Sequence, residues 1–429
     1  MKIVTPVIRG LLTTALIIIG LENGSAAFHD GGAGLCVGCH TIHGTDIATI
    51  GGPSLLREQD AGSACLFCHQ QAGDSGPTDY HVSTPFNELP QGMPPKQLTP
   101  GGDFGWLKKT YSWVPGPSLP PAYSRGERHG HNIVAADFLY DADGAYAAAP
   151  GGSYPSGGLS CISCHDPHGK YRRNSDGSIS TTWSPITGSG SFASSPEPGV
   201  NKAVGVYRLL GGKGYLPKSL TGGFAFVNDP PAAVAPNTYN RSEAATQTRV
   251  AYGSGMSEWC RNCHPDMHTQ AYPGNTNLLH PAGNSAGLGA AKAGNYNAYI
   301  KTGDLSGLAS TSYLSLVPFE EGTTDYATLK AHAKTDGSWL AGPDTTAQVM
   351  CLTCHRAHAS GWDGIMRWNA ETGYIVYSGA YAQEGQPEQT YGQGRREAEA
   401  VRAYYDMPAA NFSPNQDSLC NKCHIGIYP

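Results

Sequence analysis

The sequence predicts a fold made mostly of irregular loops, with short helices and little strand, and two features of its 429 residues indicate this. Glycine and proline contribute 56 and 31 residues, about a fifth of the chain, which favours turns over long regular elements. All 12 cysteines belong to copies of one pentapeptide, Cys-x-x-Cys-His, spaced unevenly along the chain. Two cysteines three positions apart face the same way on one helical turn, so a short helix is expected at each copy.

This pentapeptide is the attachment motif of c-type haem. Its two thiols can form thioether bonds to the vinyl groups at one porphyrin edge, and its histidine then lies under the iron. The predicted haem-attaching cysteines are Cys36, Cys39, Cys65, Cys68, Cys161, Cys164, Cys260, Cys263, Cys351, Cys354, Cys420 and Cys423. The predicted proximal iron ligands are His40, His69, His165, His264, His355 and His424. The sequence therefore predicts six c-type haems.

Two other uses of paired cysteines explain the pattern less well. A disulfide framework suits an exported protein, but it gives no reason for a histidine after every second cysteine. Structural zinc sites combine two Cys-x-x-Cys pairs and require no histidine at this fixed place. The recurring histidine therefore favours haem.

Each iron needs a second axial ligand, and histidines outside the motifs outnumber the haems. This surplus favours bis-histidine ligation over methionine, which would raise the reduction potential. The candidate distal ligands are His29, His43, His81, His131, His168, His280, His332 and His358. We expect His129 and His268 instead at the surface or bonded to propionates, with a hydrogen bond near His131 as a further role for His129.

Three of these candidates, His43, His168 and His358, each follow a motif histidine by three residues. If the local turn is helical, both imidazoles project from one face. Two imidazoles on one face cannot bind both sides of one iron. The second one must therefore reach a neighbouring haem, which would hold two haems close together.

The N-terminal residues 1–27 are expected to form a cleaved signal peptide. Lys2 and Arg9 flank the apolar run Leu11–Leu21, and small residues follow up to Ala27. An uncleaved membrane anchor is the alternative, but this run is shorter than the ~20 residues that span a bilayer. Residues 28–429 would then form one domain wrapped around a continuous haem stack, with the haems providing most of the apolar core.

Few other local elements are expected. Good helix formers predict a helix over Arg395–Tyr405. Segments rich in proline, glycine and serine predict loops at Pro85–Pro100, Pro115–Pro121 and Ser184–Pro198. The stretch Asp141–Gly144 is similar to the start of a calcium loop, but it lacks the later acidic ligands and is expected to be a plain turn.

Beyond the motifs, the whole chain after residue 27 resembles the filament-forming hexahaem cytochromes of metal-reducing bacteria, the OmcS type. The stretches that carry the resemblance are Phe28-His29, Gly101–Tyr111, Cys164–Arg173, Thr246–Tyr252, Tyr313–Gly322 and Leu419–His424. The resemblance implies subunits that polymerise head to tail into extracellular filaments with an unbroken haem stack. It also implies that His43 of one subunit ligates the fifth haem of the next, held by Cys351, Cys354 and His355.

These observations favour long-range extracellular electron transfer without substrate chemistry. Acceptors would be ferric minerals, electrodes or other redox proteins, and the net charge of −6 gives no sign of nucleic-acid binding. Two alternatives are a periplasmic electron shuttle that does not polymerise and a multihaem reductase. A reductase needs an iron with an open position, which the surplus of histidines disfavours.

Overall fold

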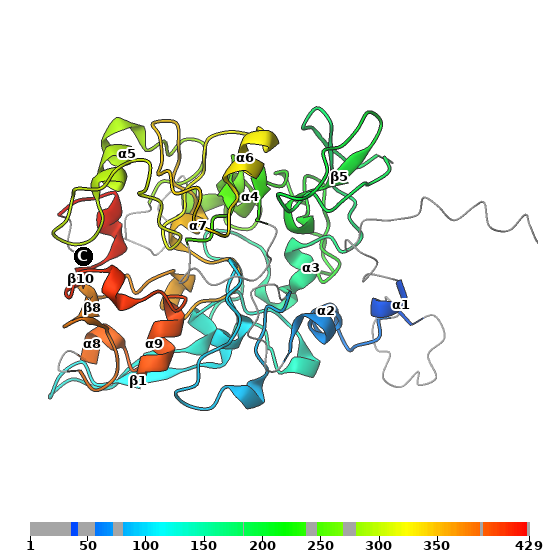
Figure 1. Cartoon of the computed structure of the whole chain (residues 1–429). Coiled ribbons are helices and arrows are strands. Elements are labelled where there is room, and N and C mark those ends of the chain that lie inside the picture. Colours follow the sequence, from blue (N-terminus) through cyan, green and yellow to red (C-terminus); the bar gives the residue numbers. More distant parts are fainter. Residues whose placement is uncertain are drawn as a thin grey trace, which may run out of the picture.

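The computed structural model describes residues 36–41, 56–71, 80–182, 184–236, 247–268, 280–386 and 389–426. Short elements carrying the cysteine motifs are spread along the length of the molecule (Figure 1). The first motif helix, α1, lies at one end, and α2 and α3 follow it. Helices α4 and α7 lie toward the middle, and the C-terminal segment lies at the opposite end.

Helices are short throughout the described residues. The α-helices are α1 Cys36–Cys39, α2 Ala61–His69, α3 Cys161–Cys164, α4 Met256–Cys260, α5 Gly289–Ala298, α6 Tyr326–His332, α7 Cys351–Cys354, α8 Gln389–Gly392 and α9 Glu397–Ala403. The 3₁₀ helices are η1 Phe86–Glu88, η2 Phe104–Lys108, η3 Gly126–Arg128, η4 Ala136–Phe138, η5 Ser156–Gly158, η6 Tyr207–Leu209, η7 Pro265–His268, η8 Asp363–Ile365, η9 Ala409–Asn411 and η10 Leu419–Lys422.

Strands are also short, and within the described ranges they pair with one another in antiparallel fashion. They are β1 Tyr111–Trp113, β2 Ala122–Ser124, β3 Arg172–Asn174, β4 Ile179–Ser180, β5 Ala203–Gly205, β6 Ala233–Val234, β7 Ala251–Tyr252, β8 Tyr374–Tyr377, β9 Ala380–Tyr381 and β10 Gln416–Asp417. The sheets have the orders β1-β2, β4-β3-β5, β6-β7 and β10-β8-β9. The predicted fold of loops with short helices and little strand is confirmed.

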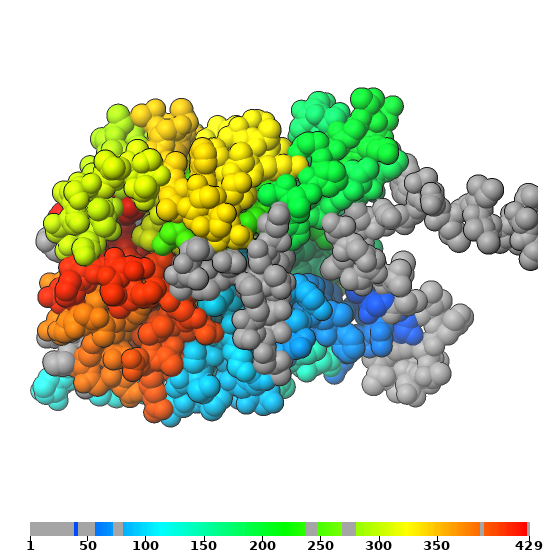
Figure 2. All heavy atoms as spheres, in the orientation of Figure 1, coloured from blue at the N-terminus to red at the C-terminus, as the bar shows by residue number. Residues whose placement is uncertain are grey.

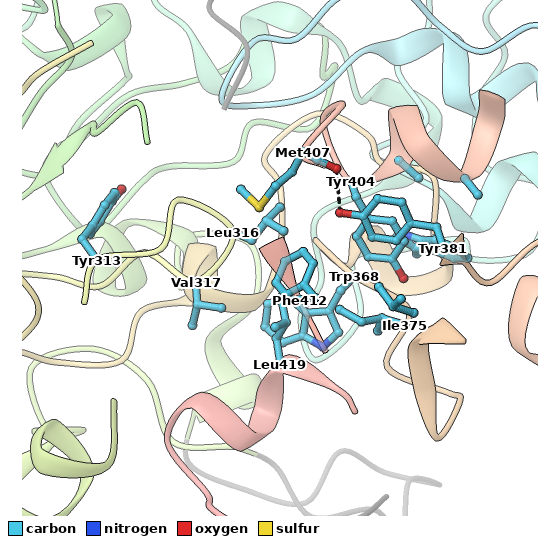
Figure 3. Close-up of a cluster of buried hydrophobic side chains, with 14 of the residues drawn as sticks. Tyr313, Leu316, Val317, Trp368, Ile375, Tyr381, Tyr404, Met407, Phe412 and Leu419 are labelled. Atoms are coloured by element: carbon cyan, nitrogen blue, oxygen red, sulfur yellow. Dashed lines mark hydrogen bonds between the residues drawn. The ribbon is translucent and has the colours of Figure 1, made fainter. Parts of the chain in front are cut away.

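Side chains form several buried apolar clusters. The largest cluster includes the residues of Figure 3, where Tyr381 and Tyr404 stack with ring centroids 4.2 Å apart and Tyr381 Oη donates to the Met407 carbonyl at 2.9 Å. Offset stacking of this kind adds ~0.5–1.5 kcal/mol to the burial itself. Side chains from several segments therefore form part of the apolar core.

Segments distant in sequence share each face of the molecule. Figure 2 shows the lime-coloured region around α5 next to the red C-terminal segment, with the yellow α6 region beside it. A side-chain contact ties the first two together, because Asn295 Nδ2 donates to the Cys423 carbonyl at 2.9 Å. No helix among the described residues is both long enough and apolar enough to cross a bilayer.

The predicted helix over Arg395–Tyr405 exists but is shorter at both ends. Helix α9 begins at Glu397, because Arg396 has extended backbone angles (φ −75°, ψ 164°). It ends at Ala403, and Tyr405 and Asp406 then adopt left-handed backbone with φ of 59° and 56°.

The three predicted loops contain no α-helix or strand in their described residues, although η1 lies within the first. The stretch Asp141–Gly144 is a turn, as expected. Asp143 Oδ1 accepts from the N–H groups of Ala145 and Tyr146 at 2.7 and 2.9 Å.

Candidate haem-binding site

Polar side chains cap the N-termini of two of the helices that carry the motifs. Asp60 accepts from the Ser63 N–H at 2.7 Å before α2, and Ser160 accepts from the Ile162 N–H at 3.3 Å before α3. Such caps satisfy amide groups that have no partner inside the helix. Each cap therefore fixes the position of the cysteines that follow it.

The ring nitrogens of four motif histidines have a common partner type. Nδ1 of each lies 2.7–2.8 Å from a backbone carbonyl oxygen: His69 with Tyr80, His165 with Arg208, His264 with Pro150 and His355 with Gly364. A carbonyl that accepts from Nδ1–H fixes the ring orientation and leaves Nε2 as the ligating atom. In the sixth motif, by contrast, His424 Nδ1 lies 3.2 Å from Lys292 Nζ.

Two of the accepting carbonyl groups lie in segments with left-handed backbone conformation. Arg208 has φ of 51° and is followed by Leu209 at 52°, and Gly364 at 66° is followed by Ile365 at 61°. Left-handed backbone is uncommon for residues other than glycine and clusters where function demands it. Nothing in the sequence indicated these accepting carbonyl groups, because a backbone oxygen leaves no signature in residue type.

Four motif histidines each face a second histidine across a gap of similar size. Ring centroids are 6.3 Å apart for His40 and His168, 6.4 Å for His165 and His358, 6.1 Å for His264 and His131, and 5.9 Å for His424 and His280. With iron–nitrogen bonds of about 2 Å on both sides, two axial imidazoles are expected to have centroids about 6 Å apart. The paired rings therefore fit a bis-histidine haem.

Burial keeps several of these imidazoles neutral, as ligation requires. Burial and the nearby charge of His264 lower the pKa of His131 to about 4. Burial and the charge of His165 lower the pKa of His358 to about 3. Both rings therefore present a lone pair at neutral pH.

The described pairs follow a rule in sequence. His168 comes directly after the third motif and faces His40 of the first. His358 comes directly after the fifth motif and faces His165 of the third. In both cases the histidine three residues beyond a motif faces the proximal histidine two motifs earlier.

Other predicted ligands have different surroundings. His332 Nδ1 donates to a Glu321 carboxylate oxygen, and the His332 ring stacks on Trp339 with centroids 4.1 Å apart. His81 is buried beside His69, and burial followed by the charge of His69 lowers its pKa. Among the described residues, His355 makes no ring contact with another histidine. His29 and His43 lie outside the described residues, as do the predicted signal-peptide residues 1–27.

The cysteines are arranged in neighbouring motifs rather than in disulfides. None of the cysteines whose side chains are described forms a disulfide, and no cluster of three or more metal-binding side chains occurs in those ranges. A hydrogen bond with the Cys161 thiol raises the pKa of Cys65, and the same contact with Cys351 raises that of Cys260. The second and third motifs therefore meet at their first cysteines, as do the fourth and fifth.

His129 is not at the surface, contrary to one expectation from the sequence. It is fully buried, with Nε2 2.7 Å from Ser124 Oγ and Nδ1 3.0 Å from the Trp106 carbonyl. Asp363, next to the Gly364 carbonyl that orients His355, accepts from Ser124 Oγ at 2.5 Å. His129 thus takes a hydrogen-bonding role close to the ligands, as the sequence also allowed.

Comparison with known proteins gives close relatives. The chain is 55% identical over 411 residues to the C-type cytochrome OmcS of Geobacter sulfurreducens, covering 93% of this chain and 94% of the relative. It matches a solved outer membrane cytochrome S filament from that organism with TM-score 0.85 and 53% identity, over 93% of this chain and 100% of the other. A cryo-EM structure of OmcS nanowires matches with TM-score 0.84 and 54% identity, over 91% and 98% of the two chains. No protein-family profile matches.

Proposed function

The chain belongs to the OmcS family of c-type cytochromes, and we propose that it carries six c-type haems and conducts electrons along filaments of identical subunits. It is an electron-transfer protein rather than an enzyme. The chemistry that haem supplies is reversible one-electron reduction at iron. The chain attaches the porphyrins, orients the axial imidazoles and sets the spacing between them.

The paired imidazoles support an axial ligand set for four of the six haems, numbered here by motif. His168 would ligate haem 1, His358 haem 3, His131 haem 4 and His280 haem 6. For haem 2 the candidates are His81, His29 and His332. In every case two imidazoles leave no open position at iron, which argues against a multihaem reductase.

The distal ligand of haem 5 provides the argument for polymerisation. His355 makes no ring contact with another histidine in the described residues. His43 lies three residues beyond the first motif, so by the rule above it should face a motif histidine two motifs earlier. The chain has no motif before the first, so that histidine must belong to another subunit. In a head-to-tail row of subunits with six motifs each, it belongs to the fifth motif of the neighbouring subunit. The rule therefore supports His43 as the ligand of haem 5 in trans, and it makes the assembly directional.

Contacts between motifs support a continuous path. The thiol contacts of Cys65 with Cys161 and of Cys260 with Cys351 bring the attachment edges of haems 2 and 3, and of haems 4 and 5, together. His168 and His358 link haem 1 to the third motif and haem 3 to the fifth. Electron tunnelling falls steeply with distance, so such closeness favours conduction.

We further propose export and an extracellular location. Residues 1–27 would be removed as a signal peptide, leaving one domain of residues 28–429. The filament would lie outside the cell or at its surface, and its acceptors would be ferric minerals, electrodes or other redox proteins.

The substitution His43→Ala tests the assembly. We expect six covalently attached haems by intact mass, no filaments by electron microscopy, and one haem per subunit that binds carbon monoxide after reduction. Added imidazole should restore the six-coordinate spectrum of that haem without restoring filaments. His268→Ala is the control, because it removes a histidine that we do not expect to ligate iron.

Filaments of normal length from the His43→Ala protein would contradict the trans ligand. Wild-type protein with six haems that remained monomeric would instead favour the periplasmic shuttle. Fewer than six attached haems would contradict the cofactor count.

A further inference from the structure

Glu320 is a fully buried carboxyl group that the axial ligand set does not use. Its Oε1 accepts from the N–H of Met256, the first residue of α4, at 2.7 Å. Its Oε2 is buried and has no hydrogen-bond partner. An ionised carboxylate with one oxygen lacking a hydrogen bond is costly to bury, so the protonated form of Glu320 is favoured in the interior.

Two other buried side-chain oxygens in this region, on Gln348 and Glu258, also lack a hydrogen-bond donor. Glu320 and Gln348 are directly opposite each other and exchange backbone hydrogen bonds of 3.0 and 2.9 Å, which places their side chains on the same face. Gln348 Oε1 and Glu258 Oε2 are both buried and without a partner. A proton on Glu320 would supply the donor that this group of acceptors lacks.

The charges around Glu320 favour that proton. Burial, and after it the charge of Glu258 on α4, raise the pKa of Glu320 to about 8, although hydrogen bonds from the N–H groups of Met256 and Ser257 act in the opposite direction. The neighbouring residue Glu321 has an ion pair of its own, because Arg249 Nη2 lies 2.9 Å from its Oε1. The other Glu321 oxygen bonds His332. Among the described residues no ion pair reaches Glu320.

Glu320 also lies at the junction of two haem motifs. Helix α4, which it caps, ends at Cys260 of the fourth motif, and Cys260 contacts Cys351 of the fifth. Ser257 Oγ, one residue along α4, accepts from the Cys351 N–H at 3.0 Å. The carboxyl group therefore lies where the attachment edges of haems 4 and 5 meet.

We propose that Glu320 is a redox-linked proton-binding site that couples electron transfer through haems 4 and 5 to proton uptake, an inference that rests on the proposed function. Above about pH 8, where Glu320 is ionised while the haems are oxidised, it would gain one proton from water when one electron reaches either motif and return that proton to water when the electron leaves. The local charge is then the same before and after the transfer. Ionised Glu320 would otherwise repel the incoming electron in a medium of low dielectric constant.

Glu258 provides the route to solvent. It is half-buried, and its Oε1 accepts from the N–H of the exposed Asn284 at 2.7 Å. Its other oxygen is buried without a hydrogen-bond partner. Because its charge also raises the pKa of Glu320, Glu258 is the carboxyl group through which we expect the proton to exchange with solvent.

The test compares wild type with Glu320→Gln, using Glu397→Gln at the exposed start of α9 as the control. Below about pH 8 Glu320 is protonated in both redox states, so potentials there should not depend on it. Above about pH 8 the wild-type potentials of two haems should fall, with a limit of about 59 mV for each tenfold drop in proton concentration. This slope should be lost in Glu320→Gln and kept in Glu397→Gln.

Infrared difference spectra of the wild type provide a second readout that does not depend on folding of the variant. Above pH 8, reduction should increase the carbonyl stretch of a protonated carboxylic acid, and this band should shift in D₂O. An unchanged pH slope in Glu320→Gln, or no carboxylic acid band on reduction of the wild type, would overturn the proposal. If either result is obtained with a protein that still carries six haems and still forms filaments, only the proton-coupling proposal is wrong and the proposed function is unaffected.

Discussion

Adding one methyl group beside His358 tests its proposed role as the distal ligand of haem 3. A Cβ at Gly101 would lie 2.9 Å from His358 Nδ1, 3.0 Å from Cε1 and 3.2 Å from Cγ. Ordinary contacts begin at 3.4 Å, so the imidazole must retreat by about half an ångström. The backbone of Gly101 cannot retreat instead, because its carbonyl accepts from the His358 N–H at 2.7 Å and a Cβ at Gly102 would already overlap the Ala359 carbonyl oxygen.

The substitution Gly101→Ala should therefore weaken imidazole binding at haem 3. The ring has little room, since Phe104 stacks on it with centroids 4.8 Å apart. Overpacking of this kind costs ~1–3 kcal/mol. At 1.36 kcal/mol per factor of ten, this corresponds to a weakening of roughly 5- to 150-fold.

Carbon monoxide binding to the reduced protein measures this effect. The wild type should bind none, whereas Gly101→Ala should bind about one molecule per subunit and show a loss of six-coordinate low-spin signal at one haem. Gly199→Ala is a matched control, because a Cβ there meets nothing within 4 Å and the backbone is not left-handed. A Gly101→Ala protein with wild-type spectra and no bound carbon monoxide would refute the assignment of His358 to haem 3.

Two further predictions concern stability. Lys109→Met removes the partner of buried Glu399, whose Oε1 lies 2.7 Å from Lys109 Nζ, and should lower the free energy of unfolding by ~3–5 kcal/mol in denaturant titrations. The double variant Lys109→Met/Glu399→Gln should recover part of this loss, and no recovery would mean that the uncompensated charge is not the cause. Burial raises the pKa of Asp363, but hydrogen bonds from His129 and Ser124 outweigh it and hold the pKa at about 2. This depressed pKa contributes stability above pH ~4 that is lost as the pH falls toward 2, on the order of 1–2 kcal/mol after screening, and Asp363→Asn should remove that part of the acid dependence of the melting temperature.

The sequence alone determined the chemistry. Each Cys-x-x-Cys-His motif is local, so two thiols and one imidazole are brought together by a single helical turn, and the element type follows from the same five residues. The scarcity of long helices and strands also followed from composition. The exact ends of α9 did not, because left-handed backbone at Tyr405 and Asp406 depends on packing around them.

The tertiary structure decided which histidine faces which motif. His358 and His165 are far apart in the chain, and nothing in residue type distinguishes His358 from His332, which instead contacts Glu321 and Trp339. Buried Glu320 and the carbonyl oxygens that orient the proximal rings were equally invisible in the sequence. Attachment of a cofactor needs only neighbours along the chain, whereas its axial pairing, spacing and electrostatic surroundings arise from contacts between distant segments, which only folding brings together.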